Sequence, residues 1–295
     1  MTIIEALNWG QEKLKATAHE KRQAKLNPML DAQVLLSECL ERPTAYLFAH
    51  FEDELPQIII EKYQRMIERR ARHEPVAYIV GRKEFYGRPF FVNPAVLIPR
   101  PETEQLIEQA ISRVKPTSLI LDVGTGSGVI AVTITAETDQ PVIATEIDKN
   151  ALAIARHNAQ AHGLEHMISF MQGNLLEPYL EKNIKTTGPQ DKVLILANLP
   201  YGRIAQWPTL DPDVTQYEPK SAIIGGLDGL DIYDELLGQL RSYRQLFPDE
   251  TELLMEIDPG QELSAPALVR EHFPAAEIDV LNDLANKPRI VIAKI

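Results

Sequence analysis

The residues best placed to do chemistry are Asn198, Leu199, Pro200 and Tyr201, which directly follow an apolar run at 194–197. That run shows no polar alternation, which is typical of a parallel strand covered on both faces. Ligands of open α/β sheets bind beyond the carboxyl ends of such strands, so we expect the tetrapeptide at the mouth of a pocket. Asn198 offers a side-chain oxygen, Leu199 a backbone carbonyl held extended by the next proline, and Tyr201 a flat ring. Two acceptors beside an aromatic face suit a planar amino group.

A second candidate site is the glycine-rich turn in which Gly124, Gly126 and Gly128 alternate between a strand-like and a helix-like apolar run. Glycines there let the backbone approach a ligand closely at a helix N-terminus. Glu146 ends the next strand-like run about 20 residues later, where a carboxylate grips ribose hydroxyls. The glycine spacing does not match G-x-G-x-x-G, so a nicotinamide-dependent oxidoreductase is disfavoured. Together these residues predict a nucleoside site on one sheet.

Strand-like and helix-like segments alternate from about residue 117 onward. The expected strands lie at 119–123, 142–146, 168–171, 194–198 and 252–257, followed by a hairpin pair at 276–281 and 290–294. Repeated βα units of this kind predict an α/β fold with a doubly wound parallel sheet. The polar segment 181–192 is expected to be a surface loop.

The first part of the chain has a different pattern, with apolar residues at helical spacing up to about residue 72. Aromatic residues around a Gly–Pro turn at 84–92 then predict a β-hairpin. We therefore expect a helical domain at 1–72, a β-hairpin linker at 73–100 and the α/β domain at 101–295. Arg100 lies between two prolines, so this stretch has two open interpretations, a rigid linker or a wall of the pocket.

Composition narrows the class of protein. The 295 residues carry a formal net charge of −12, with 44% hydrophobic and 24% charged residues, which is ordinary for a soluble globular protein. An acidic chain is repelled by phosphate backbones, so stable nucleic-acid binding is not expected. A single cysteine, no membrane-spanning run and no secretory signal favour a reducing cytoplasm. The seven histidines have no metal-ligand spacing, and no metal is expected.

The segment 122–128, Asp-Val-Gly-Thr-Gly-Ser-Gly, resembles the first motif of class I S-adenosylmethionine-dependent methyltransferases. More closely, the chain resembles the glutamine-N5 methyltransferases that modify peptide chain release factors. The stretches specific to that family lie at 74–81, 84–87, 97–104, 217–219, 225–230 and 283–291. The resemblance implies a Rossmann-like methyltransferase domain preceded by a helical domain that contacts the release factor. It also implies S-adenosylmethionine as cofactor, and we expect a cytoplasmic monomer that makes no membrane contact.

The resemblance and the residue patterns together give a set of expected roles. Catalysis is assigned to Asn198, Leu199, Pro200 and Tyr201, which would also bind substrate together with Phe90 and Arg100. Cofactor binding is assigned to Gly124, Thr125, Gly126, Ser127, Gly128, Glu146, Asn174, Leu175 and Asn198. Asn198 Oδ1 and the Leu199 carbonyl would accept the two hydrogens of the substrate amide, and Tyr201 would hold its plane.

Two positions depart from the family pattern. Leu199 replaces the first proline of the usual Asn-Pro-Pro-Tyr, which adds an N–H donor that needs a partner. Asn174 stands where the family carries an acidic residue that binds adenine, although an amide oxygen also accepts from an amino group. Leu175 falls where an aromatic residue often lines the adenine pocket.

Two alternative functions stay open at this point. Asn-Leu-Pro-Tyr is also similar to the tetrapeptide of ribosomal RNA adenine dimethyltransferases, so an adenine-N6 methyltransferase acting on a flipped base in RNA or DNA is one. The departures at Leu199 and Asn174 suggest the other, a binding module that keeps the methyltransferase fold without activity.

Overall fold

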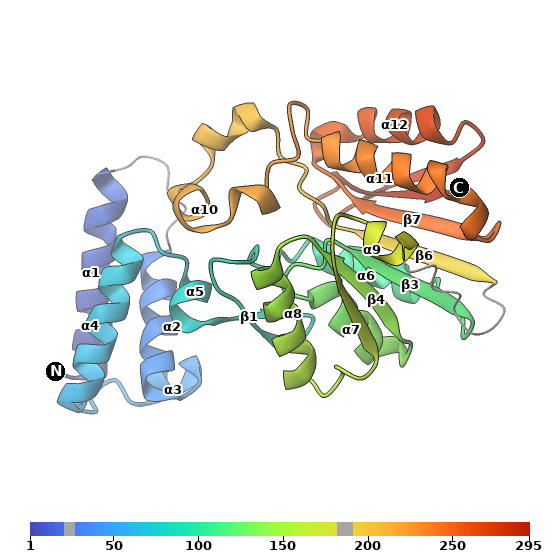
Figure 1. Cartoon of the computed structure of the whole chain (residues 1–295). Coiled ribbons are helices and arrows are strands. Elements are labelled where there is room, and N and C mark those ends of the chain that lie inside the picture. The colour runs from blue at the N-terminus through green and yellow to red at the C-terminus, as the bar shows by residue number, and fades with distance from the viewer. Residues whose placement is uncertain (21–26, 182–190) are drawn as a thin grey trace. The chain divides into compact units, whose positions relative to one another are not determined.

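The computed structural model describes residues 1–20, 27–181 and 191–295, so most of the expected loop at 181–192 lies outside the described residues. Within these, the chain forms two compact units (Figure 1). The helical unit comprises 1–82 and 208–218, and the sheet unit comprises 83–207 and 219–295. No helix in the described part of the chain is both long and apolar enough to cross a bilayer.

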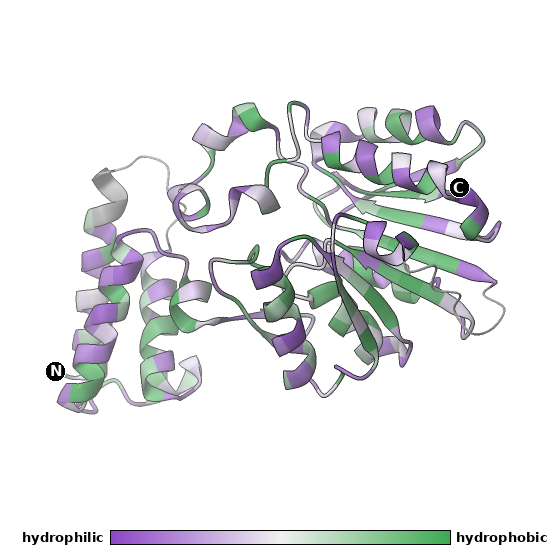
Figure 2. Ribbon diagram, in the orientation of Figure 1, coloured by the Kyte–Doolittle hydropathy of each residue, from purple (hydrophilic) through white to green (hydrophobic). Residues whose placement is uncertain are grey.

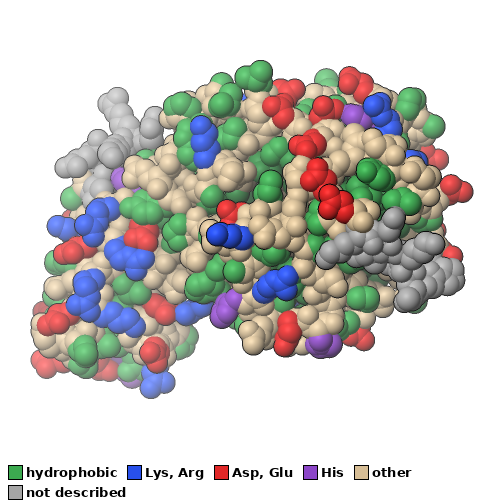
Figure 3. Space-filling model, viewed as in Figure 1, with side chains coloured by type: hydrophobic (Ala, Val, Ile, Leu, Met, Phe, Trp, Pro, Cys, Tyr) green, Lys and Arg blue, Asp and Glu red, His purple; other side chains and the backbone are tan. Residues whose placement is uncertain are grey.

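The helical unit is built from amphipathic helices around its own apolar core. Its helices are α1 (Ile3–Glu20), α2 (Pro28–Leu40), α3 (Thr44–Ala49), α4 (Gln57–Ala71), α5 (Val76–Val80) and α10 (Pro212–Tyr217). Asn27 caps α2, because its side chain accepts from the backbone N–H of Leu30 at 3.3 Å. Lys and Arg side chains are frequent on the visible face of this unit (Figure 3).

A buried arginine holds three of these helices together. Arg70 of α4 has a side chain that is only 5% exposed, and it donates to Asp31 Oδ2 of α2 at 2.7 Å. It also donates to Asp213 Oδ2 of α10 at 2.8 Å. A buried guanidinium needs such partners because an unpaired charge is costly to desolvate. The pair with Asp213 explains why residues 208–218, distant in sequence, belong to the helical unit.

The sheet unit begins with the expected hairpin, formed by β1 (Arg82–Phe85) and β2 (Arg88–Phe91). Tyr86 and Gly87 both have positive φ at the turn, +50° and +69°. Positive φ at both central residues is the geometry of a type I′ hairpin, which explains the glycine.

The main sheet has the strand order β5-β4-β3-β6-β7-β9-β8. Its strands are β3 (Ser118–Val123), β4 (Val142–Glu146), β5 (Ile168–Gln172), β6 (Lys192–Ala197), β7 (Thr251–Glu256), β8 (Glu277–Asn282) and β9 (Pro288–Lys294). β3 to β7 pair in parallel, whereas β9 runs antiparallel to both of its neighbours. The predicted parallel sheet with a final hairpin pair is thus confirmed, and its order reverses between β3 and β6.

Helices cover both faces of this sheet (Figure 1). One face packs against α6 (Thr103–Ile111), α7 (Val129–Thr138) and α8 (Lys149–Ala161). The other packs against α9 (Glu177–Glu181), α11 (Asp231–Ser242) and α12 (Ser264–His272). Short 3₁₀ segments lie at η1 (Ile204–Thr209), η2 (Lys220–Ala222), η3 (Arg244–Leu246) and η4 (Pro259–Gln261).

The central strands are apolar without alternation because both of their faces are buried. In β6, Val193 and Ile195 enter the core on the α11 side, whereas Leu194 and Leu196 enter the core on the α7 side. Figure 2 shows these strands as largely hydrophobic between helices of mixed character. A sheet sandwiched in this way brings the carboxyl ends of its parallel strands to one edge, where ligands bind.

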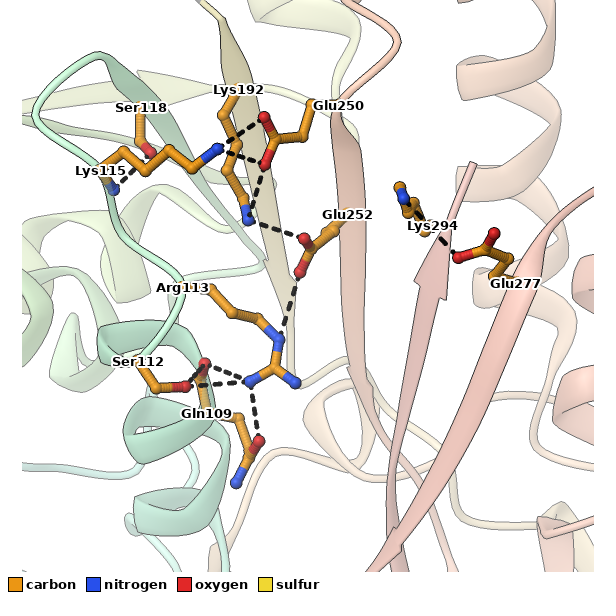
Figure 4. Close-up of polar contacts among 10 residues, drawn as sticks. All are labelled: Gln109, Ser112, Arg113, Lys115, Ser118, Lys192, Glu250, Glu252, Glu277 and Lys294. Atoms are coloured by element: carbon orange, nitrogen blue, oxygen red, sulfur yellow. Dashed lines mark hydrogen bonds and ion pairs between the residues drawn. The ribbon is translucent and has the colours of Figure 1, made fainter.

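The opposite edge carries a network of ion pairs instead (Figure 4). Lys192, the first residue of β6, is buried and lies 2.7 Å from Glu252 Oε1 and 3.5 Å from Glu250 Oε1. Lys115 binds Glu250 at 2.6 Å, and Arg113 binds Glu252 at 3.2 Å. The network neutralises the buried ammonium and ties the start of β6 to the start of β7.

Candidate active site

The side chain of Asn198 is held in one orientation at the carboxyl end of β6. Its Nδ2 donates to Thr103 Oγ1 at 2.9 Å, and Thr103 is a buried residue at the start of α6. Because this contact uses the amino end of the amide, Oδ1 is left as the acceptor of the side chain. Both residues line one pocket of about 600 Å³.

The extra N–H at Leu199 has the partner that the sequence required. It donates to the hydroxyl oxygen of Tyr233 at 3.2 Å, and Tyr233 of α11 is fully buried. That hydroxyl in turn lies 3.1 Å from the carbonyl oxygen of Ala197 and 2.6 Å from that of Glu256. A phenolic O–H both donates and accepts, so one group satisfies polar atoms of β6 and β7 together.

Tyr201 is anchored away from the pocket wall. Its hydroxyl donates to Glu256 Oε1 at 3.1 Å, and its ring packs against the core on the α11 side. Burial raises the pKa of Glu256 to about 7, although hydrogen bonds from Thr103 and Tyr201 favour its charged form. Residues 198–201 at the carboxyl end of β6, called the strand tip below, are thus held at three points, through Thr103, Tyr233 and Glu256.

The glycine loop packs directly under this tip. Gly124 has φ +73°, and a Cβ there would lie only 2.7 Å from Leu199 Cδ2. Gly128 has φ +83°, and a Cβ there would lie 3.1 Å from the backbone of Ala155 in α8. Any other residue would therefore be strained by the positive φ at these two positions, and its Cβ would require Leu199 or α8 to shift.

Asp122, the penultimate residue of β3, holds the glycine loop in place through hydrogen bonds. It is fully buried and accepts hydrogen bonds from Thr125 Oγ1 at 2.5 Å and from the Ala131 N–H at 3.1 Å. Burial raises its pKa to about 7, because desolvation outweighs these two hydrogen bonds. The carboxyl group therefore links the strand, the loop and the first turn of α7.

Glu146 holds the loop from the neighbouring strand. Its Oε2 accepts from the Gly126 N–H at 2.9 Å and its Oε1 from the Asp148 N–H at 3.0 Å. Burial raises the pKa of Glu146, and the hydrogen bonds from backbone N–H groups partly offset that shift. The backbone N–H of Ile147 is a third hydrogen-bond partner of this carboxylate. An ionised carboxylate has about four acceptor sites, so acceptor capacity is left for a hydroxyl of a ligand.

The pocket brings together most of the residues that the sequence singled out. Those on its wall are Arg100, Gly124, Thr125, Gly126, Ser127, Glu146, Asn174, Leu175, Asn198, Leu199 and Pro200. Gly128, Tyr201 and Phe90 do not line it. The wall also includes residues that sequence reasoning missed, among them Thr103, Ile147 and Glu235. The stretch around Arg100, for which a wall of the pocket was one of two interpretations, was the only sequence signal near Thr103, and no sequence signal indicated Glu235.

Phe90 is a core residue instead of a cover over the substrate. It is fully buried, and its ring lies 6.1 Å from that of Phe85 and 5.1 Å from that of His162. A ring enclosed in this way has no face to offer a substrate. The hairpin pairing decides this, because Phe90 and Phe91 point to opposite faces of β2.

We expect Phe90→Ala to lower the free energy of unfolding by about 3–5 kcal/mol, because it leaves a cavity in the core. Urea unfolding measures this change. Phe91→Ala is the matched control, since Phe91 is 38% exposed and its loss should cost about 1 kcal/mol or less. Unchanged stability of Phe90→Ala, with a higher KM for substrate, would contradict the core assignment.

Two family models match the chain, the PrmC N-terminal domain at residues 5–81 and the ribosomal protein L11 methyltransferase (PrmA) at residues 101–199. A release factor glutamine methyltransferase of Staphylococcus aureus is 32% identical over 285 residues, covering 96% of this chain and 98% of that protein. The chain belongs to the release factor glutamine methyltransferase family. A member from Xylella fastidiosa is 42% identical over 209 residues, covering 68% of this chain and 71% of the relative.

A solved structure has a similar fold. The hMettl16 catalytic domain, in complex with MAT2A 3′UTR hairpin 6, matches with a TM-score of 0.53 at 15% identity, over 70% of this chain and 74% of that one. This match confirms the predicted Rossmann-like fold, and the relatives described above identify it as a methyltransferase domain. Leu199 and Asn174, the two positions at which the sequence analysis expected a departure from the family pattern, both have partners here, Tyr233 and Glu235.

Proposed function

We propose that this protein transfers the methyl group of S-adenosylmethionine to the side-chain amide nitrogen of the glutamine in the Gly-Gly-Gln motif of peptide chain release factors. The observation that carries this proposal is the anchored amide of Asn198, whose acceptor oxygen shares a pocket with the glycine loop and Glu146. Relatives matched over nearly the whole chain bear the name release factor glutamine methyltransferase, which supports the same reaction.

The residues of the pocket fit S-adenosylmethionine. Glu146 has acceptor sites left for the ribose hydroxyls, and Asn174 can present an amide oxygen to the adenine. The backbone at Gly124 and Gly126 leaves room that a side chain would fill. When bound, the cofactor supplies an electrophilic methyl group on a positively charged sulfur.

The strand tip would orient the substrate amide. We infer that Asn198 Oδ1 and the Leu199 carbonyl each accept one hydrogen of that amide, because a primary amide nitrogen carries two. Its lone pair is delocalised into the carbonyl, so the nitrogen is a weak nucleophile and depends on orientation. Acceptors fixed in advance also stabilise the positive charge that develops on the nitrogen. The stacking of Tyr201 on the amide plane stays a prediction.

No strong base is required at this site. The nitrogen becomes cationic only after it gains the methyl group, and such a cation loses its proton readily to water. The neutral oxygens of Asn198 and Leu199 are therefore sufficient acceptors. We further propose that the protein acts as a cytoplasmic monomer on release factors.

Mass spectrometry tests the proposal directly. Incubation of a purified release factor with the enzyme and S-adenosylmethionine should add one methyl group to the Gly-Gly-Gln glutamine, located by fragmentation of the peptide. The same enzyme should leave adenines of an RNA oligonucleotide unmethylated. A methylated adenine with an unmodified glutamine would favour the adenine-N6 alternative, and neither product would favour the inactive module.

A further inference from the structure

Asn174 and Glu235 form a polar pair on the wall of the pocket. Asn174 follows β5, and its Nδ2 donates to Glu235 Oε1 of α11 at 2.5 Å. The two residues are 61 positions apart in sequence, and both line the pocket beside Gly173 and Leu175. Their pairing is therefore a product of the fold and has no local cause in the chain.

The same helix holds this loop at a second point. Gln239, one turn after Glu235 in α11, accepts from the Leu176 N–H at 2.9 Å through its Oε1. Residues four apart lie on one face of a helix, so α11 presents both contacts to the loop. Leu175 between them has φ +49° and is buried, which fixes the backbone on which Asn174 stands.

The chemistry of the pair determines which end of the amide faces the ligand. An asparagine amide presents a donor end or an acceptor end with nearly the same shape. A carboxylate is an acceptor only, so the amino end of Asn174 must face Glu235. The oxygen of Asn174 then points away from Glu235 and is the end left for a ligand.

We propose that Glu235 is a positioning residue that locks Asn174 as an acceptor for the exocyclic amino group of the cofactor's adenine. This inference rests on the proposed function, since it assumes an adenosyl cofactor in this pocket. An inosyl analogue carries a carbonyl oxygen in place of the amino group, so two acceptors would face each other. The pair therefore makes the site select adenosyl over inosyl ligands.

The pair also explains the absence of an acidic residue at position 174. An aspartate there would bring a second carboxylate against Glu235, and adjacent like charges disfavour ionisation of both. With a carboxylate at position 235 only, Asn174 is free of this repulsion and presents an oriented acceptor to the ligand.

Calorimetric titration with S-adenosylhomocysteine and S-inosylhomocysteine tests the lock without measuring activity. The wild-type protein should prefer the adenosyl ligand by about 100-fold, as expected for a site that must pair a polar group. Glu235→Gln should reduce the preference to about 10-fold or less, because a glutamine both donates and accepts and lets Asn174 turn over. Glu177→Gln is the matched control, since it removes an exposed carboxylate nearby that does not line the pocket.

The second part of the test moves the carboxylate from position 235 to position 174. Asn174→Asp alone should weaken S-adenosylhomocysteine binding by about 10-fold or more, whereas Asn174→Asp with Glu235→Gln should return it to within about threefold of wild type. Two results would each overturn this inference and leave the proposed function standing. One is a full adenosyl preference in Glu235→Gln, and the other is a double variant that binds S-adenosylhomocysteine as weakly as Asn174→Asp does. A wild-type protein that binds neither ligand would overturn the proposed function as well. Thermal unfolding confirms that each variant is folded.

Discussion

Asn198→Ala should nearly abolish methyl transfer, by about 10²–10³-fold in kcat, and leave cofactor binding nearly unchanged. The substitution removes the oxygen that accepts a hydrogen of the substrate amide, so the nitrogen loses both its orientation and its charge stabilisation. Loss of one such preorganised group lowers kcat by about 10²–10³-fold. Transfer of a labelled methyl group to a release factor measures kcat, and calorimetry with S-adenosylmethionine measures the dissociation constant, which should change by about threefold or less.

Thr103→Val tests whether the orientation of Asn198 Oδ1 matters in addition to its presence. Valine keeps the shape of threonine and removes the hydroxyl that accepts from Asn198 Nδ2 and also donates to Glu256. The amide can then turn over, so we expect an intermediate loss of kcat, about 10-fold, with KM nearly constant. Asn282→Ala on β8 is the control for loss of an asparagine elsewhere. Normal methylation by Asn198→Ala would show that the role assigned to Asn198 is wrong.

The sequence predicted the sheet well because its central strands have an unusual composition. β3 and β6 each contain an apolar run, at 119–121 and 193–197, as expected when helices cover both faces, and a polar or glycine-rich turn follows each strand. The ends of these strands could therefore be predicted from the sequence. Because parallel strands end at one edge, the amino-acid pattern alone was enough to place Asn198, Gly126 and Glu146 together.

Partners distant in sequence could not be predicted in this way. Thr103 is 95 residues from Asn198, and Tyr233 is 34 residues from Leu199. Their contacts depend on how α6 and α11 pack on the sheet, which periodicity does not specify. The sequence could state that the Leu199 N–H needed an acceptor, but it could not say that a tyrosine hydroxyl would supply one.

Phe90 shows a different limit. Two adjacent aromatic residues in a short strand carry no alternation, so the pattern cannot say which ring faces the core. The pairing of β1 with β2 turns Phe90 inward and leaves Phe91 partly exposed. A one-residue shift in register would exchange their roles, and only the structure fixes that register.

Glu146→Ala should raise the dissociation constant of S-adenosylmethionine by about 100-fold. The carboxylate is assigned to the ribose hydroxyls, and hydrogen bonds to a charged group contribute about 1.5–3 kcal/mol each. Alanine also releases the N–H groups of Gly126 and Asp148, which loosens the loop under the ligand. Calorimetry measures the dissociation constant, and Glu165→Ala, in an exposed turn, is the control.

Steady-state kinetics distinguishes this effect from that of Asn198. Glu146 acts on cofactor affinity, so saturating cofactor should restore kcat of Glu146→Ala to near the wild-type value. Asn198 acts on the substrate amide, so no concentration of cofactor should rescue Asn198→Ala. Glu146→Gln, which keeps one acceptor oxygen, should weaken binding by about 10-fold. Cofactor affinity unchanged in Glu146→Ala would refute the ribose assignment, whereas a kcat that stays low at saturation would move Glu146 from cofactor binding into the chemical step.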